Sequence, residues 1–403
     1  MSNAQATEQS ERILKQLVDE GKPILGYVYP HTPLEIIMAH GLMPALLYAN
    51  PTVMGSYEAS LQTFACSFIR NMFSQRVNDQ LPYVNGIVFP GNTCDSLQNL
   101  ADIWHLRFPQ DKIFRLTYPA GDQGEAAVQY FAEELRIFSN TLEDAYGSPF
   151  SDATFRQAVD LVQQFRNAIQ FLYAARLVQP SSVPYHRIAA FVREFHSAPL
   201  EMVVDELRAT VNDVEHGLAE AGRVDSTKAL QHALLERRLE DVSLPPDLPT
   251  PRIAIVGGMT EPQAIAELVS AISKVSSTAV VFDLLSFGFK TIFTPMPAFE
   301  GNPFETMARS VLGALLEPTQ EGLPKRLDFL KDVLTHLAID GLIVCEQSFC
   351  DPDEFESPSL LAVASEVGVR TVRLPVDPEF SDRARLEGRI QSFLETLAHG
   401  GAA

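Results

Sequence analysis

The chain has 403 residues, of which 46% are hydrophobic and 20% are charged. This length predicts two or three packed domains, and the composition excludes wholesale disorder as well as collagen-like and coiled-coil architectures. Asp and Glu number 51 against 31 Lys and Arg, and the formal net charge of -20 argues against nucleic acid as a partner. No run of 18 apolar residues occurs and the N-terminus is polar, so we expect a cytoplasmic protein without a membrane span or secretion signal.

Residues 1–22 predict an N-terminal helix, over roughly Glu8–Glu20, and residues 23–150 predict a first α/β domain. A further helix carries Cys66 and another begins at Asp95. Strands that alternate with helices over this length indicate a parallel, doubly wound sheet. The strands of this domain are expected at Pro23–Tyr29, Met43–Tyr48, Gly86–Phe89 and Lys112–Thr117.

Residues 151–244 change to a helical pattern, with apolar residues at helical spacing from Phe155 to Leu172, and predict a helical bridge. The prolines of residues 245–251 cannot continue a helix and predict a stiff linker. Residues 252–403 predict a second α/β domain. The expected fold class is therefore α/β, with two doubly wound parallel-sheet domains of flavodoxin- or Rossmann-like type bridged by a helical segment. The second set of strands is expected at Arg252–Val256, Ala279–Asp283, Gly341–Val344 and Arg370–Leu374.

The two α/β halves resemble each other around a cysteine. Cys94-Asp95 follows one strand and precedes a helix, and Cys350-Asp351 does the same in the second half. The carboxyl ends of parallel strands are where such sheets bind ligands, and a thiolate beside a helix N-terminus is stabilised by the free N–H groups. The alternative is two unrelated buried cysteines, because cysteine is common in protein cores.

Several common chemistries leave no trace in the sequence, which lacks the P-loop, G-x-G-x-x-G, H-E-x-x-H and G-x-S-x-G motifs. Four cysteines are too few for a disulfide scaffold. Cys66, Cys94 and Cys350 are candidates for a three-thiolate site, with Cys345 as a spare. Structural zinc usually uses C-x-x-C pairs, so single cysteines from different domains favour an iron-sulfur cluster in a domain interface.

An ordered set of short motifs runs through both halves of the sequence. It comprises Gly26-Tyr-Val-Tyr-Pro-His-Thr-Pro33-Leu-Glu35, Ala39-His-Gly41-Leu-Met-Pro44, Cys66-Ser-Phe-Ile-Arg70, Gly86-Ile-Val-Phe-Pro-Gly-Asn-Thr-Cys94-Asp95, Phe349-Cys350-Asp351 and Gly388-Arg389-Ile-Gln-Ser-Phe393-Leu-Glu395. With these motifs, over about residues 23–396, the chain resembles the superfamily of 2-hydroxyacyl-CoA dehydratases and ATP-dependent benzoyl-CoA reductases, specifically the iron-sulfur catalytic subunit.

The resemblance implies a 4Fe-4S cluster held by Cys66, Cys94 and Cys350. It implies radical dehydration of a 2-hydroxyacyl-CoA to a 2-enoyl-CoA through a ketyl radical, in an oxygen-free setting. The alternatives are a subunit of a benzoyl-CoA-type reductase, a non-catalytic iron-sulfur electron-transfer protein, and a binding protein with structural zinc. The implied partners are an acyl-CoA thioester substrate, a paralogous second subunit that completes a heterodimer, and an ATP-hydrolysing iron-sulfur activator protein.

Glu35 is the carboxylate that we consider as a catalytic base or substrate contact, since it lies just beyond the first strand. The alternative is a capping box in which Thr32 caps the helix and Glu35 bonds back to it. Asp95 and Asp351 are interpreted as helix caps or supporting partners. Arg70 is a candidate to orient a thiolate or a CoA phosphate, or else a surface arginine. The segment 282–290 departs from the family pattern, which leaves the acyl group open.

Overall fold

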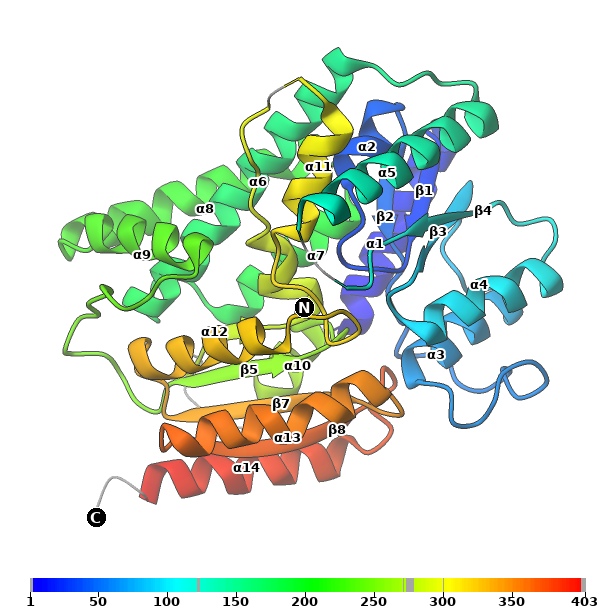
Figure 1. Cartoon of the computed structure of the whole chain (residues 1–403). Coiled ribbons are helices and arrows are strands. Elements are labelled where there is room, and N and C mark those ends of the chain that lie inside the picture. Colours follow the sequence, from blue (N-terminus) through cyan, green and yellow to red (C-terminus); the bar gives the residue numbers. More distant parts are fainter. Residues whose placement is uncertain (1–2, 122–123, 271, 273–278, 300, 400–403) are drawn as a thin grey trace.

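The computed structural model describes residues 3–121, 124–270, 272, 279–299 and 301–399, and it contains two four-stranded parallel sheets (Figure 1). The strand orders are β2-β1-β3-β4 and β6-β5-β7-β8, so the two sheets have the same topology. The predicted α/β fold class with two doubly wound parallel sheets is confirmed. The strands are β1 (Ile24–Tyr27), β2 (Met43–Leu46), β3 (Gly86–Gly91), β4 (Ile113–Thr117), β5 (Ile253–Gly257), β6 (Val280–Leu284), β7 (Gly341–Gln347) and β8 (Arg370–Val376).

Helices connect the strands and cover the sheets. In the first half they are α1 (Asn3–Asp19), α2 (Leu34–Ala39), α3 (Ser67–Val77), α4 (Asp95–Arg107) and α5 (Glu125–Tyr146). In the second half they are α10 (Pro262–Ser270), the π-helical turn η1 (Ser286–Lys290), α11 (Pro303–Leu312), α12 (Leu323–His336), α13 (Asp351–Glu366) and α14 (Arg383–His399). In the ranges given above, no helix combines the length and the apolar character that crossing a lipid bilayer requires.

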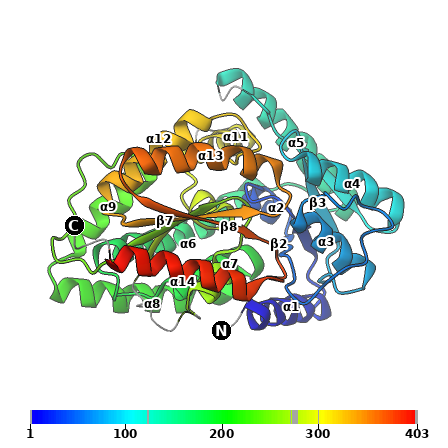
Figure 2. The same cartoon turned by 90° about the horizontal axis from the view of Figure 1, so that it is seen from below.

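Both faces of the second sheet are buried, as a parallel sheet requires. Ile253 and Ile255 of β5 share a core cluster with residues of α10 and α14, whereas Ala254 and Val256 belong to the cluster that includes α12 and α13. Figure 2 shows α12 and α13 on one side of this sheet and α14 on the other. Because alternate residues of a strand point to opposite faces, burial of both faces explains why β5 is an unbroken apolar run.

After α5 and before β5 the chain forms four helices, α6 (Asp152–Val178), α7 (Tyr185–Ser197), α8 (Leu200–Glu220) and α9 (Val224–Glu236), so the predicted helical segment is confirmed. The α6 helix begins after Ser151, whose hydroxyl accepts a hydrogen bond from the Thr154 N–H. Residues 169–178 of α6 are all buried, and α6 contacts α2 of the first half and β6 of the second. The predicted linker, residues 245–251, forms neither helix nor strand.

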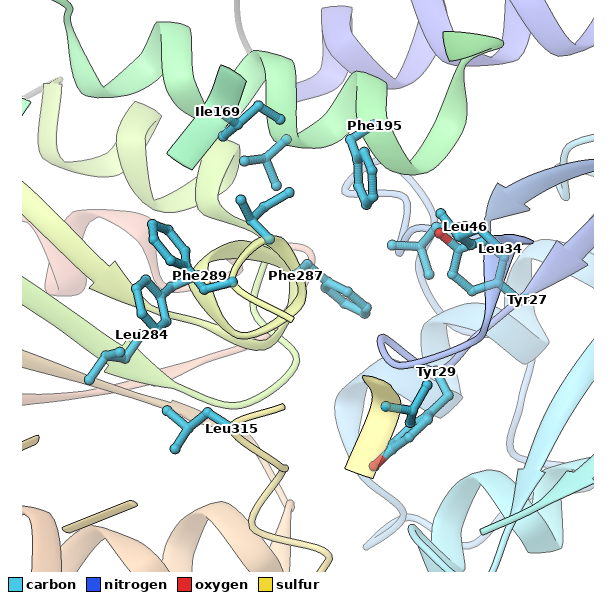
Figure 3. Packing of buried hydrophobic residues seen from close by; sticks show 14 of the residues in the cluster. Tyr27, Tyr29, Leu34, Leu46, Ile169, Phe195, Leu284, Phe287, Phe289 and Leu315 are labelled. Carbon is cyan, nitrogen blue, oxygen red and sulfur yellow. The ribbon is translucent and has the colours of Figure 1, made fainter. Parts of the chain in front are cut away.

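One apolar core continues from the first half of the chain into the second. The ring of Phe287 in η1 lies 5.9 Å from the ring of Tyr48 and 6.3 Å from that of Phe68, measured between centroids. Figure 3 shows Phe287 between Phe289 of the second half and Leu34 of the first. Because the halves share this core, the division into domains at the predicted boundaries stays a prediction.

The start of α2 differs from the predicted capping box. Pro33, not Thr32, is the N-cap residue, and the Thr32 hydroxyl donates a hydrogen bond to the Tyr29 carbonyl oxygen at 2.8 Å. Glu35 does not bond back to the cap. Its carboxylate is fully buried and accepts a hydrogen bond from Arg166 Nη1 of α6 at 3.1 Å. The prediction is wrong because a buried carboxylate is stabilised more by a charged partner than by a backbone N–H.

The turn η1 is held by a buried carboxyl group. Asp283 accepts hydrogen bonds from the hydroxyls of Tyr173 (2.5 Å) and Tyr185 (3.1 Å) and from the N–H groups of Leu285 (3.2 Å) and Phe289 (3.1 Å). These four donors replace the hydration that burial removes, so the carboxyl group is fully satisfied. The turn therefore has a fixed shape, and it places the side chains of Ser286 and Lys290 where both donate hydrogen bonds to Glu317.

Gly288→Ala tests this packing. A Cβ atom at residue 288 would lie 2.2 Å from Asp283 Oδ1, so we expect the substitution to lower the free energy of unfolding by about 1–3 kcal/mol, measured by urea denaturation. The matched control is Gly217→Ala in α8, where no atom lies within 4 Å of the new Cβ. Removing a helical glycine there is expected to raise stability by up to about 1 kcal/mol. Equal effects of both changes would contradict the proposed packing.

Candidate functional site

Three of the four cysteines occupy the same position relative to a helix. Cys66 is the N-cap residue of α3, Cys94 of α4 and Cys350 of α13. All three line one cavity of about 1220 Å³. The α4 and α13 helices follow β3 and β7, which are the third strands of their halves and occupy the same place in the two sheets. Cys94 and Cys350 therefore occupy corresponding positions in the two sheets, as the sequence predicted.

The cavity lies between the halves, at the carboxyl ends of the strands. Two wall segments come from the first half, within residues 61–69 and 93–103, and two from the second, within residues 318–326 and 349–356. Ligands of open parallel sheets bind at this edge, next to the point where the strand order reverses. A volume of this size accommodates a ligand of several hundred daltons, so the cavity is large enough for more than a metal centre.

The thiols at this cavity resist ionisation. Burial raises the pKa of Cys66 and raises that of Cys94 to about 12. Burial also raises the pKa of Cys350, and the charge of Asp353 raises it further. The thiols act on one another too, because Cys66 raises the pKa of Cys94, and both raise that of Cys350. Three thiolates could therefore coexist here only if a cationic group replaced their protons.

The helix N-termini oppose this cost in part. The backbone N–H groups of Ile69 and Phe68 lower the pKa of Cys66, although less than burial raises it. Those of Leu97 and Ser96 act in the same way on Cys94. Unpaired N–H groups of a first helical turn carry partial positive charge, so three helices direct positive ends at the thiols. The three helix N-termini therefore favour negative charge at the thiols.

Across the described part of the chain, no three histidine, cysteine or carboxylate side chains are close enough together to hold one metal ion. The three thiols surround a cavity instead. Cys345 lies outside it, in β7, and lines a separate pocket of about 30 Å³. A zinc ion with four cysteine ligands therefore does not fit this arrangement of the described residues.

The chain is similar over most of its length to known proteins. The family model for 2-hydroxyglutaryl-CoA dehydratase, D-component, matches residues 30–397. The chain belongs to this family. It is 20% identical to the (R)-phenyllactyl-CoA dehydratase beta subunit of Clostridium sporogenes, over 96% of this chain and 94% of the relative. It is 23% identical to the beta subunit of lactoyl-CoA dehydratase of Anaerotignum propionicum, over 94% and 93%. It is 24% identical to a benzoyl-CoA reductase subunit of Thauera aromatica, over 86% and 84%.

In this member of the dehydratase D-component family, a loop of the second half, residues 317–322, forms one wall of the cavity and reaches the first half. We call it the crossing loop. The Glu317 carboxylate lies 3.1 Å from His31 Nε2, accepts a hydrogen bond from Lys290 Nζ at 3.0 Å and is fully buried. Gln320 accepts a hydrogen bond from the Tyr29 hydroxyl at 2.8 Å. The sequence analysis missed these residues because they lie far apart in the chain and form no motif.

Some buried oxygens on the cavity wall lack partners. Among them, Thr93 Oγ1 and Glu356 Oε2 make no hydrogen bond with the described residues. The other oxygen of Glu356 accepts a hydrogen bond from Arg326 Nε at 2.8 Å. A buried polar group without a partner costs free energy, so these oxygens indicate that the cavity takes a polar ligand.

The remaining predicted residues fall into two groups. Asp95 and Asp351 line the cavity as the first residues of α4 and α13, but the cysteines occupy the cap positions. The interpretation of these aspartates as helix caps is therefore wrong, and the alternative, that they are supporting partners, stays a prediction. Their negative charge is favourable in a first helical turn. Glu35 does not line the cysteine cavity and pairs with Arg166 beneath the first sheet. Its role as a catalytic base stays a prediction that this position does not favour.

Glu317→Gln is expected to destabilise the protein in a pH-dependent way. Burial alone raises the pKa of Glu317, but Lys290 and His31 outweigh burial and hold the pKa at about 2. A depression of this size below 4.5 corresponds to about 3 kcal/mol of stability, which is present above pH 4.5 and is lost as the pH falls toward 2. We therefore expect a loss of about 3 kcal/mol at pH 7 that shrinks below pH 4.5, measured by urea denaturation.

The control for this prediction is Glu366→Gln, which removes a carboxylate from an exposed ion pair with Lys331. Surface pairs contribute little, so the free energy of unfolding should stay nearly constant. A Glu317→Gln effect of equal size at pH 7 and at pH 3 would show that the ionised carboxylate is not what stabilises the crossing loop.

Proposed function

We propose that the chain is the 4Fe-4S cluster-carrying subunit of an enzyme that dehydrates a 2-hydroxyacyl-CoA to a 2-enoyl-CoA. The observation that carries the proposal is the convergence of Cys66, Cys94 and Cys350, from both halves of the chain, on one cavity. Two relatives with dehydratase names, each similar over nearly the whole chain, support it.

The residues present fit such a cluster. Cys66, Cys94 and Cys350 would be its three ligands, and the helix N-termini behind them would stabilise its negative charge. When bound, the cluster supplies one-electron transfer and, at an iron without a cysteine ligand, a Lewis-acid position. The chain contributes a partly apolar enclosure that limits water, formed in part by Leu61, Ile69 and the side chains of α4.

The charge of the cavity wall indicates which part of an acyl-CoA it accepts. Arg326 is the one basic residue among the described wall residues, and it is paired with Glu356. Five acidic side chains, Asp95, Asp102, Glu321, Asp351 and Glu356, line the same cavity. CoA phosphates need cationic partners, so the acyl thioester end belongs in this cavity and the nucleotide end outside it. The phosphate contacts would then come from a partner, which agrees with a paralogous second subunit in a heterodimer.

The second candidate is a subunit of a benzoyl-CoA-type reductase, which the relative from Thauera aromatica favours. The two candidates differ in electron balance, because dehydration consumes no reductant overall, whereas reduction of an aromatic ring does. Both agree with an ATP-hydrolysing iron-sulfur activator as electron donor and with an oxygen-free site. A non-catalytic electron-transfer protein, the third alternative, would bind no CoA thioester.

Cys66→Ser, Cys94→Ser and Cys350→Ser are each expected to abolish cluster assembly, because each removes one of three thiolate ligands. The measurement is iron and acid-labile sulfide content after anaerobic purification, with about four of each per chain in the unchanged protein. Electron paramagnetic resonance identifies the cluster type.

Cys345→Ser is the matched control. Cys345 is buried but lies outside the cavity, so its variant should retain nearly all iron and sulfide. Retained iron in one of the first three variants would remove that residue from the ligand set. A metal-free or zinc-only protein, after anaerobic reconstitution has also failed, would overturn the proposal.

The substrate class is tested on the loaded protein, co-expressed with its genomic neighbours and supplied with an activator, ATP and a reductant. With 2-hydroxyacyl-CoA thioesters we expect enoyl-CoA to form in many turnovers for each electron supplied. Product that forms only in proportion to electrons, and from aromatic CoA thioesters, would identify the reductase instead. Calorimetry without thioester binding would favour the electron-transfer protein.

A further inference from the structure

The two halves of the chain are bonded to each other beside two of the cysteines. The N–H of Ser67, the residue after Cys66, donates a hydrogen bond to the Ser348 carbonyl oxygen at 2.9 Å. The Gln347 side chain donates to Ser67 Oγ at 2.5 Å, and both side chains are buried. The first turn of α3 is thus attached to the segment that leads into Cys350.

Arg70 adds a second connection between these segments. It lies one helical turn after Cys66, and its guanidinium carbon is 4.9 Å from the ring centroid of Phe349, the residue before Cys350. The same group lies 5.3 Å from the ring centroid of Tyr57, and Nη1 donates to the Tyr57 hydroxyl at 3.2 Å. Arg70 is therefore held between an aromatic ring of each half.

The conformation of Phe349 is unfavourable for its residue type. Its φ angle is +62°, in the left-handed region that bulky side chains rarely adopt, and 52% of its surface is exposed. Burial of the ring does not explain why a phenylalanine occupies this position, and the backbone conformation is unfavourable for a phenylalanine. The contact with Arg70 gives a reason for an aromatic side chain here, because a cation over the face of a ring is attracted by the ring electrons.

We propose that Arg70 is a positioning residue that holds the Cys66 and Cys350 segments in fixed relation across the two halves. The proposal deepens the proposed function and rests on it for the role of the two cysteines as ligands. A cluster with ligands from both halves requires that their relative placement survive small motions of the halves. The Arg70–Phe349 contact joins the segment of Cys66 to the segment of Cys350, although neither Arg70 nor Phe349 is itself a proposed ligand.

The experiment compares Arg70→Met with the unchanged full-length chain. Hydrogen–deuterium exchange is measured on the metal-free protein, at the N–H of Ser67 and of Cys350, and does not depend on a cluster. Loss of a partly exposed cation–aromatic contact predicts exchange that is roughly 2- to 5-fold faster at these two amides. In the loaded protein, iron release to a chelator should accelerate by a similar factor.

Arg76→Met is the matched control on the same helix. Arg76 also lies over an aromatic ring, 4.5 Å from the centroid of Phe108, and pairs with Asp111 at 2.8 Å, but both of these partners belong to the first half. Its loss is expected to lower overall stability without a selective change at Ser67 and Cys350. Equal changes in both variants would overturn the positioning role, because they would show general destabilisation.

Variants of Phe349 separate the ring from the backbone strain. Phe349→Tyr retains an aromatic face and should behave as the unchanged chain, whereas Phe349→Leu should resemble Arg70→Met. The double variant Arg70→Met with Phe349→Leu should add little to either single change, since both remove one contact. Additive effects, or unchanged exchange in Arg70→Met, would overturn the proposal. Faster exchange in a chain that never binds iron would support the positioning role and reject the cluster.

Discussion

The spacing of the cysteines depends on the buried contacts that Glu317 of the crossing loop makes with His31 of the first half and with Lys290 of η1. Glu317 brings a carboxylate into a region without solvent, where an isolated charge would cost several kcal/mol. Lys290 comes from η1, and His31 follows β1, so the compensating groups belong to two separate elements. Because the carboxylate is stable only where both partners meet it, the halves have one preferred arrangement. The cavity, and hence the distances among Cys66, Cys94 and Cys350, follow from that arrangement.

The electrostatics of the cavity divide into an inner and an outer part. The inner part combines buried thiols, whose pKa values burial raises, with helix N-termini that favour negative charge. The outer part carries acidic side chains such as Asp102 and Glu321, which repel a polyanion. The inner part therefore favours negative charge at the thiols, whereas the outer part disfavours a polyanion.

Much of the fold was predictable because its signals are local. Each buried strand is a short apolar run, and α4 and α13 each start at a cysteine shortly after a strand ends, so Cys94 and Cys350 could be paired from the sequence. Cys66 could be proposed as a third member only because it is a further cysteine before a helix. The contact between the crossing loop and the first half was not predictable. Glu317 and His31 are separated by 286 positions in the sequence, and no spacing rule connects them. The capping box failed for the same reason, since Arg166 is remote from Glu35 in the chain.

The two turns that lead into Cys94 and Cys350 differ in backbone strain. Each turn has a left-handed residue before the cysteine, Asn92 with φ +59° two residues before Cys94 and Phe349 with φ +62° immediately before Cys350. Asparagine tolerates this conformation, because its short side chain forms local hydrogen bonds, whereas a bulky side chain rarely adopts it. The backbone strain therefore lies in the second turn. The ring of Phe349 faces Arg70 of the other half, so the strained turn is the one that joins the halves.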